Sequence, residues 1–479
     1  MGSGRGSDGG GRKGSLSEEN LMAMLESSGC KDVRDLHEDR LSFLEGVRSA
    51  TIIHRNRSTP TWKMYDAVFQ ILKDGSCLEL TMASYKLLVD LEKCYPRVYL
   101  PSSGTSASTS SNSVDLVIVS EAWSPFNFGS KQLDLLGEEG RPRDATKYID
   151  PMSFFSLTQS VAQELSEMDV CEVRSKTLSR FLLLNYLIIV LEVDFLPRYK
   201  KYKETLDWDL LKECLINLLL GSRRINFKNL IRECLSIISK ISYHHGKLNH
   251  VDRNASQDVS HMLIPDGDTH LQTAIAEYKD EVCTLAKKFL IFIMELDNVK
   301  KEADMNGLTT RTDGSRLPLV EIIVDELTYN KELVPLFLEG FTDPKWKLEI
   351  ILQYFWKYCT KSLVRTRRSN NSTEDGTLTG LLQYFLNGTS TKTVIKKLSM
   401  EIVQLLLAHA FQAFLSIQIF AKQFTFSCKK MGLCGSLVEI CKNLQLVFAS
   451  LKKVDEKMEI IPFAKEALFT AAVLSSGKC

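Results

Sequence analysis

The sequence has none of the short motifs that mark the common enzyme classes. It lacks an H-E-x-x-H helix, a G-x-S-x-G nucleophile turn, a P-loop and a pair of C-x-x-C motifs. One formal G-x-G-x-x-G begins at Gly4, but no strand pattern precedes it, so a dinucleotide site is not indicated. The sequence therefore predicts a protein that is not an enzyme, with no catalytic residues, metal ligands or cofactor.

Cysteine is present but does not form a disulfide pattern. The twelve cysteines are irregularly spaced over 479 residues, and several of them, including Cys214, Cys234 and Cys283, fall inside apolar helical runs. Free cysteine in such positions behaves as a small apolar side chain. We expect reduced thiols in a nuclear or cytosolic protein.

The sequence also shows no signal-peptide pattern and no apolar run long enough to cross a membrane. The apolar run from Phe181 to Leu191 is interrupted by Asn185 and is shorter than the roughly 20 residues that cross a bilayer. Charge of one sign is not in excess either, since the net charge is +1 and the hydrophobic share is 44%. These values are typical of a folded soluble protein, and we expect no membrane partner.

Helical patterns, in contrast, run through most of the chain. The clearest covers residues 343–368, where Asp343 and Pro344 favour a helix start and polar residues then recur at every fourth position. Most of its other positions are apolar, so other helices must cover it on several sides. About fifteen such segments, spaced about 35 to 45 residues per pair, predict an all-α fold of the irregular armadillo/HEAT-like α-solenoid kind.

Composition changes suggest three regions. Residues 1–14 are rich in Gly and Ser and are expected to be a disordered tail. Residues 15–150 form an N-terminal helical region with a Ser-rich loop at 101–113 and a weak strand signal at 115–120, and residues 151–479 form a helical solenoid region. Within the last region, residues 243–267 are predicted to be a loop rich in exposed histidines.

An aromatic segment, residues 121–129, carries Trp123, Phe126 and Phe128, and its Pro125 and Gly129 disfavour a helix. Large aromatic side chains in such a loop pack on the core of their own protein or anchor a partner. Both readings stay open from the sequence, and the three residues are candidates for partner binding.

Basic clusters are the other candidate surface. They comprise Arg198, Lys200 and Lys201, then Arg223 and Arg224, then Arg365, Arg367 and Arg368. Turns recur along one edge of a solenoid, so the first two clusters could join into a stripe that holds nucleic-acid phosphates or an acidic partner. Alternatively, they are ordinary solvated charges at helix ends, which complement the helix dipole.

Several long strings resemble one plant family. They are EAWSPFNFG at 121–129, DWDLLKECLINLLLGSRRINFK at 207–228, IMELDNVKKEADMNGLTTRTDGSR at 293–316, DPKWKLEIILQYFWKY from Asp343, and PFAKEALFTAAV at 462–473. The family is that of the negative regulators of systemic acquired resistance, the suppressors of NPR, inducible. The resemblance covers most of residues 15–475 and is weakest in the Ser-rich loop, at 130–150 and in the His-rich loop.

The resemblance implies a nuclear, armadillo-like protein that represses pathogen-response genes and restrains homologous recombination. It further implies a regulatory subunit of the structural-maintenance-of-chromosomes (SMC) five-six DNA-repair complex. In that complex the chain would be the counterpart of non-SMC element six and would bind a partner like element five. It would contact chromatin indirectly, through the complex. The family brings no catalytic residues. A direct DNA-binding repressor acting through the basic clusters is the alternative.

Overall fold

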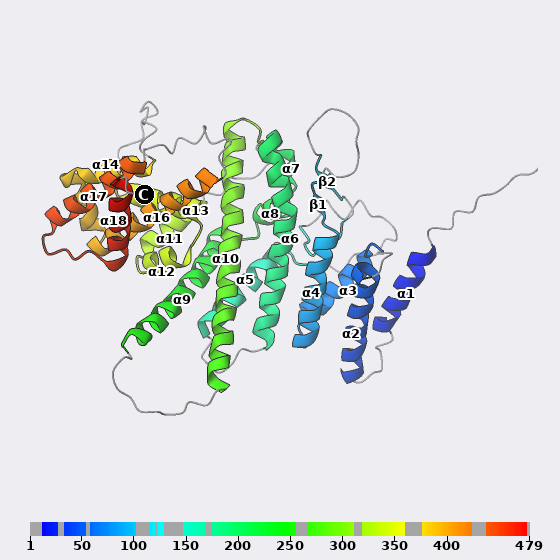
Figure 1. The fold of residues 1–479 in the computed structure, drawn as a ribbon. Coiled ribbons are helices and arrows are strands. Elements are labelled where there is room, and N and C mark those ends of the chain that lie inside the picture. Colours follow the sequence, from blue (N-terminus) through cyan, green and yellow to red (C-terminus); the bar gives the residue numbers. More distant parts are fainter. Residues whose placement is uncertain are drawn as a thin grey trace, which may run out of the picture. The chain divides into compact units, whose positions relative to one another are not determined.

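The protein is almost entirely helical. In its computed structural model the described residues form eighteen α-helices, one π-helical turn and one two-stranded ribbon (Figure 1). The all-α prediction is confirmed, while the solenoid arrangement stays a prediction. The structure describes residues 12–26, 33–53, 58–101, 115–119, 122–128, 147–167, 175–254, 267–310, 319–359, 376–423 and 437–476.

The helices group into two units, each described by itself. Unit 1 comprises Met1–Glu233, Ile264–Leu285 and Asn298–Arg316, and unit 2 comprises Cys234–Leu263, Ala286–Asp297 and Leu317–Cys479. Unit 1 thus continues past residue 150, where the composition suggested a boundary. Two long helices, α9 (Phe227–Asn254) and α10 (Gly267–Met305), contribute residues to both units.

Unit 1 is built mainly from the first eight helices and the ribbon. Helix α1 begins at Arg12, within the last residues of the stretch that was expected to be a tail. The elements are α1 (Arg12–Glu26), α2 (Val33–Arg48), the π-helical turn (Ser49–Ile53), α3 (Trp62–Asp74), α4 (Leu78–Cys94), β1 (Val98–Tyr99), β2 (Val117–Ile118), α5 (Pro151–Glu167), α6 (Ser175–Thr205), α7 (Asp209–Lys212) and α8 (Leu215–Leu220).

Helices α2, α3 and α4 lie side by side with alternating direction (Figure 1). Ion pairs at both ends set this order: Arg40 of α2 meets Asp74 at the end of α3, and Arg48 at the end of α2 meets Asp90 late in α4. Helix α3 ends at Gly75, whose φ of 56° is left-handed and suits glycine. Helices α2 and α4 are therefore parallel, with their amino ends at the same end of the group.

The short strand predicted at 115–120 is present. Val117 and Ile118 pair antiparallel with Tyr99 and Val98. A ribbon of two residues per strand adds little stability by itself, so its value is to tie the chain after α4 to the segment that leads into the aromatic loop.

Helix α6 includes the first basic cluster, which the sequence placed in a turn. The helix continues through Pro197 to Thr205. Proline lacks an N–H, so the carbonyl of Val193 loses its helical donor, yet the helix persists because buried Phe195 and Tyr202 hold its last turns against the core. The basic residues of this stretch therefore lie on a helix and not in a loop.

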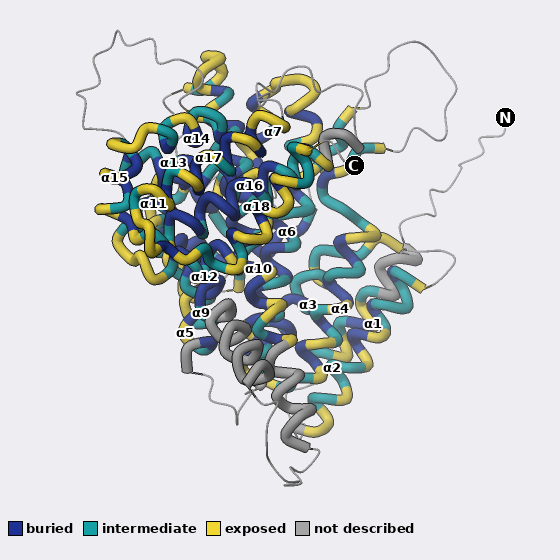
Figure 2. The backbone as a smooth tube through the Cα atoms, turned by 60° about the vertical axis from the view of Figure 1, so that its left-hand side comes forward, coloured by how far each residue is buried: buried dark blue, intermediate teal, exposed yellow. Residues whose placement is uncertain are grey.

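Unit 2 holds the carboxyl-terminal helices, and Figure 2 shows buried stretches of α13 and α16 in its interior. Its elements, besides parts of α9 and α10, are α11 (Leu319–Tyr329), α12 (Leu333–Gly340), α13 (Pro344–Cys359), α14 (Leu378–Leu386), α15 (Gly388–Lys397), α16 (Met400–Gln423), α17 (Leu437–Val454) and α18 (Pro462–Ser475).

Helix α13 fulfils the strongest prediction from the sequence. The Asp343 carboxylate accepts a hydrogen bond from the Trp346 N–H at 2.9 Å, and Pro344 is the first helical residue. Eight side chains of the helix are buried, whereas the predicted polar stripe, from Lys345 to Lys357, is not. Helices α11, α14, α15 and α16 pack around it, with α16 in the most extensive contact.

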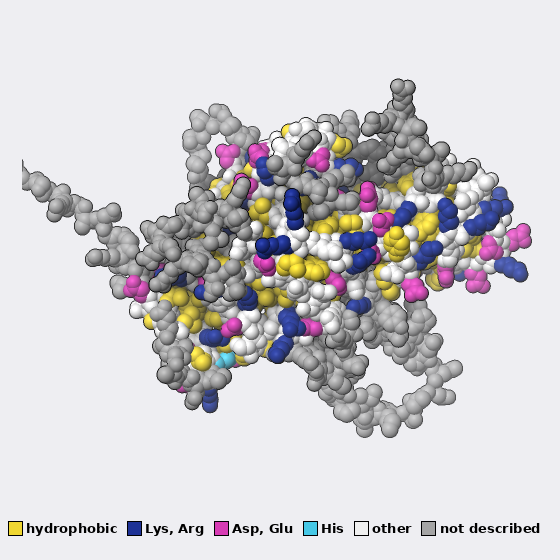
Figure 3. Space-filling view, turned by 180° about the vertical axis from the view of Figure 1, so that it is seen from behind, with side chains coloured by type: hydrophobic (Ala, Val, Ile, Leu, Met, Phe, Trp, Pro, Cys, Tyr) yellow, Lys and Arg dark blue, Asp and Glu magenta, His cyan; other side chains and the backbone are white. Residues whose placement is uncertain are grey.

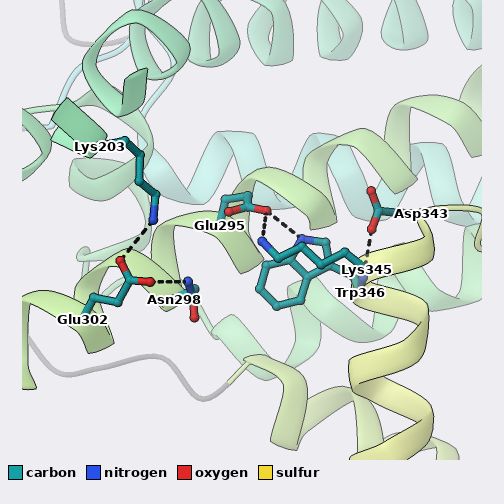
Figure 4. A network of polar contacts seen from close by, with 7 residues as sticks. All are labelled: Lys203, Glu295, Asn298, Glu302, Asp343, Lys345 and Trp346. Atoms are coloured by element: carbon teal, nitrogen blue, oxygen red, sulfur yellow. Dashed lines mark hydrogen bonds and ion pairs between the residues drawn. The ribbon is translucent and has the colours of Figure 1, made fainter. Parts of the chain in front are cut away.

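Figure 4 shows how polar groups fix the start of α13 within unit 2. One carboxylate oxygen of Glu295 accepts from Lys345 Nζ at 2.6 Å and from Trp346 Nε1 at 3.0 Å. The Lys345 ammonium also lies 4.4 Å from the centre of the Trp346 ring. This carboxylate anchors an indole N–H that burial would otherwise leave without a partner.

Helix α16 is long and apolar enough, by composition alone, to cross a membrane over Met400–Ile419. Half of that window is buried inside the protein, against α13 and α18. A core helix passes the same test, so length and hydropathy are weak evidence for a span. Buried Gln404 also binds the turn before α18, donating to the Glu459 carbonyl and accepting from the Ile461 N–H, both at 3.1 Å.

One predicted loop was wrong. Residues 243–254, predicted as loop, continue α9, so the first three histidines of this stretch lie on a helix. Elsewhere, α7 and α8 are separated near Cys214, and α15 and α16 are separated at Leu398.

The cap of α13 gives a testable consequence. Replacing Asp343 by Ala removes the acceptor for the Trp346 N–H, and we expect unit 2 to lose about 1 kcal/mol of unfolding free energy. Urea denaturation measures the loss. Asn caps as well as Asp, so Asp343→Asn is the matched control and should lose much less; equal losses in both variants would contradict the capping role.

Candidate functional site

The aromatic loop, Ala122–Phe128, is part of the core of unit 1. Trp123 is buried, stacks on Tyr65 with ring centres 5.4 Å apart, and meets Phe69 edge-on at the same distance. Phe126 is also buried, between Phe128 and Phe154. The aromatic side chains of the loop therefore point inward and pack on helices α3 and α5.

Backbone bonds hold this loop in place. The Asn127 N–H donates to the Ile149 carbonyl at 3.0 Å, and the Ile149 N–H donates to the Pro125 carbonyl at 2.8 Å. Arg97 Nη2 donates to the Ala122 carbonyl at 2.7 Å. The prediction that Trp123 and Phe126 anchor a partner is therefore corrected, because both side chains are buried in the core of unit 1. Phe128 is half-buried and stacks on Phe126.

The first basic cluster divides between the inside and the outside of α6. Arg198 and Lys201 are buried, at 5% and 6% exposure, whereas Lys200 is exposed. Arg198 pairs with buried Asp194 one turn earlier at 3.3 Å and donates to the Leu210 carbonyl at 3.0 Å, and Lys201 pairs with Glu204. Arg198 and Lys201 are thus corrected as nucleic-acid contacts, since a helix presents residues one turn apart to the same side.

Asp194 shows what the buried pair does. Its second carboxylate oxygen accepts the Leu215 N–H at 2.7 Å, at the first turn of α8. Negative charge is favourable at the amino end of a helix, where the N–H groups lack helical acceptors. Asp194 and Arg198 together join α6 to both α7 and α8, which is a structural role.

The second cluster is exposed, but one member is already paired. Arg223 and Arg224 lie in the turn between α8 and α9, and Arg224 lies 3.7 Å from Asp150. Figure 3 shows lysines and arginines on one face scattered among acidic and apolar side chains, not gathered into a single basic area. The third cluster, Arg365, Arg367 and Arg368, lies outside the described residues.

A buried charged cluster connects α4, α6 and the segment before β1. Tyr186 donates to the Glu92 carboxylate at 3.1 Å, and the charges of Arg97, Asp194 and Arg198 lie close enough to affect one another. Burial raises the pKa of Glu92 to about 7, although the Tyr186 hydrogen bond and Arg97 oppose the rise. Burial likewise lowers the pKa of Arg97, against the pull of Asp194 and Glu92.

Unit 2 has its own buried titratable pair, Lys347 and His409. Lys347 Nζ donates to the Leu338 carbonyl at 2.7 Å, and burial lowers its pKa to about 8, helped by the charge of Lys287. The His409 ring lies 4.2 Å from the Phe463 ring, and burial beside Lys347 lowers the pKa of His409 to about 3. His409 is therefore neutral at physiological pH and joins α16 to α18.

Most of these titratable groups connect two elements. Glu92, Asp194 and Lys347 do so through hydrogen bonds, and His409 does so through its contact with the Phe463 ring. Sequence reasoning missed the pair of Glu92 and Tyr186 because these two residues are far apart along the chain. It also missed His37, Cys77 and Glu79, which α2 and α4 bring together in unit 1.

Comparison with known proteins is decisive about the family. The SNI1 middle domain matches residues 97–343, and the SNI1 C-terminal domain matches residues 359–479. The negative regulator of systemic acquired resistance SNI1 of Arabidopsis thaliana is 42% identical over 469 residues, which cover 97% of this chain and 95% of that protein. The chain belongs to the SNI1 family. No solved structure matches the chain.

The SNI1 middle domain begins at Arg97 and contains the aromatic loop and both described basic clusters. The SNI1 C-terminal domain begins at Cys359, the last residue of α13. Almost all of α13, including its cap, therefore precedes the C-terminal domain in the sequence, although α13 packs against helices of that domain. Residues 1–96, with α1 to α4, lie before both family domains.

The Glu92 carboxyl makes a prediction about pH. Its folded pKa of about 7 is above the ordinary 4.5, so its contribution to stability is full below pH 4.5 and is lost as pH rises through 7. We expect Glu92→Gln to remove this loss. Urea denaturation at pH 5.5 and pH 8 should show a smaller decrease in unfolding free energy for the variant than for the wild type.

A second variant is the control for this experiment. Tyr186→Phe removes the hydrogen bond that holds the Glu92 pKa down, so the loss should move to higher pH while the group still titrates. An identical pH dependence in the wild type and in Glu92→Gln would show that Glu92 is not the group responsible.

Burial of Trp123 makes a second prediction. Trp123→Ala removes a buried indole that contacts two rings, and we expect a loss of about 3 to 5 kcal/mol in unfolding free energy. Half-buried Phe128 is the comparison, and Phe128→Ala should lose less. Unchanged stability in the Trp123→Ala variant would contradict the core role and would favour Trp123 as a partner anchor.

Proposed function

We propose that this chain is a non-enzymatic negative regulator of systemic acquired resistance that represses pathogen-response genes. The observation that carries the proposal is the 42% identity to the Arabidopsis thaliana regulator over 97% of this chain. Identity at this level over nearly the full length of both proteins supports a shared role and not only a shared fold.

The proposal extends to place and partners. The chain acts in the nucleus as a regulatory subunit of the SMC five-six complex, bound to a protein like non-SMC element five, and restrains homologous recombination. The support is the resemblance of its long sequence strings to the family, together with a helical build suited to docking. Repression of defence genes would then follow from a role on chromatin through the complex.

The described surface supports contact with another protein. Several large apolar side chains are exposed on separate helices of unit 2, among them Tyr329 at 78%, Phe469 at 72% and Leu446 at 55%. Aromatic residues are enriched where proteins meet. Meanwhile buried charges such as Glu92 and Asp194 bond to other elements of unit 1 and so contribute to folding.

Direct DNA binding has less support from the structure. Of the five basic candidates that it describes, Arg198 and Lys201 are buried, and Arg224 is beside Asp150. Affinity for DNA grows with the number of phosphates that basic side chains neutralise. Lys200 and Arg223 alone would give a weak and strongly salt-sensitive contact.

The test uses Arabidopsis plants that lack their own SNI1 relative. Expressing the full chain should return pathogen-response transcripts to the level of normal plants, as measured by quantitative RNA analysis. Transcripts that stay high although the protein accumulates in nuclei would count against the repressor role. Purification of the tagged chain from the same nuclei should bring down SMC-complex subunits; recovery of the chain without them would remove the scaffold proposal.

A matched pair of variants separates the two modes of action. Arg223→Glu with Arg224→Glu reverses the exposed basic turn and should leave repression intact if the chain acts as a scaffold. Phe469→Glu changes one exposed aromatic residue and should reduce recovery of the complex if α18 lies in the contact. Loss of repression in the arginine variant, with duplex-DNA binding lost in parallel, would favour the DNA-binding mode.

A further inference from the structure

Three possible metal ligands from separate parts of unit 1 converge on one point. His37 lies in the second turn of α2, while Cys77 immediately precedes α4 and Glu79 is in its first turn. His37 Nε2 is 3.4 Å from Cys77 Sγ and 3.5 Å from Glu79 Oε2, and the three ligand atoms all lie within 4.8 Å of one another. Forty residues separate His37 from Cys77, so the fold alone brings them together.

These distances match a tetrahedral zinc site. Zinc bonds of about 2.3 Å to sulfur and about 2.0 Å to nitrogen, at the tetrahedral angle, separate the two ligand atoms by about 3.5 Å. Nitrogen and oxygen ligands are separated by slightly less, about 3.4 Å, on the same geometry. The observed His37–Cys77 and His37–Glu79 separations agree with these values, and the Cys77 and Glu79 ligand atoms lie within 4.8 Å of each other.

The chemistry of the set favours the same ion. Imidazole, thiolate and carboxylate together suit zinc, whereas calcium and magnesium prefer oxygen ligands alone. Cys77 caps no backbone N–H through its side chain, and Sγ remains available. Thiolate and carboxylate would both sit at the amino end of α4, where the helix dipole favours negative charge.

The surroundings hold the ligands in position. The Thr81 hydroxyl donates to the Cys77 carbonyl at 2.8 Å. Arg40 of α2 pairs with Asp74, which lies three residues before Cys77. His37 is partly buried, with 28% of its side chain exposed, and Glu79 is 66% exposed. One side of the cluster therefore faces solvent, which leaves a fourth coordination position open to water.

We propose that His37, Cys77 and Glu79 form a zinc site that fastens α2 to the amino end of α4. The site has three protein ligands and one water. Its place is in residues 1–96, before both family domains, and it is independent of the proposed regulatory function. An ion pair between His37 and Glu79, with a thiol hydrogen bond, would suit the same distances, so the experiment must separate the two.

The experiment uses the full chain, purified, reduced and stripped with a chelator. Zinc binding is measured by competition with a chromophoric chelator, and cobalt is then added as a spectroscopic probe. We expect one zinc per chain that depends on Cys77, and a thiolate-to-cobalt charge-transfer band in the near ultraviolet. Cys77→Ser should lose the band and weaken zinc binding by at least about 100-fold, because even loss of an outer-shell partner weakens metal sites about 10- to 100-fold.

Two further variants make the result decisive. Cys94→Ser removes an exposed cysteine at the other end of α4 and should change neither zinc affinity nor the cobalt band. Glu79→Gln changes an exposed side chain, so it should fold normally by circular dichroism while binding zinc more weakly. Equal zinc affinity in the wild type, Cys77→Ser and Glu79→Gln would overturn the site, as would a cobalt spectrum without a thiolate band.

Discussion

Burial of helices on more than one face is the constraint on which the rest of the structure depends. Helix α13 is apolar around most of its circumference, so several other helices pack against it, and its polar stripe lies on the side that is less buried. Helix α6 is covered in a similar way in unit 1, where buried side chains recur from Phe181 to Tyr202. Because each such helix must be surrounded, the chain needs many helices and little else.

The same constraint explains the buried polar groups. A helix covered on several sides still carries charged side chains near its ends, and a buried charge is costly unless it finds a partner. Asp194 therefore binds both Arg198 and the start of α8, and Glu295 binds both Lys345 and the Trp346 indole. These groups specify which helix end meets which, and apolar packing alone would specify this less sharply.

Periodicity and capping in the sequence were sufficient to predict α13, its cap and the all-α class, because these are local properties of the chain. They failed where a distant contact decided the outcome. Pro197 and the charges after it indicate a turn, but packing of Phe195 and Tyr202 keeps α6 helical, and this turns Arg198 and Lys201 inward. Trp123 and Phe126 were ambiguous for the same reason, since only Tyr65, Phe69 and Phe154 determine which way they face.

The buried titratable groups make structural contacts, and this bears on where a functional site can lie. Glu92, Asp194, Lys347 and His409 have the shifted pKa values or the burial that would draw attention to an active site, yet each of them joins two elements of its own unit. Perturbed titration marks functional sites only when the group faces a substrate, and structural networks perturb pKa values equally well. The exposed side chains are then where the proposed contacts with a partner would form, because proteins recognise one another by the shape and chemistry of a surface and not by one reactive group.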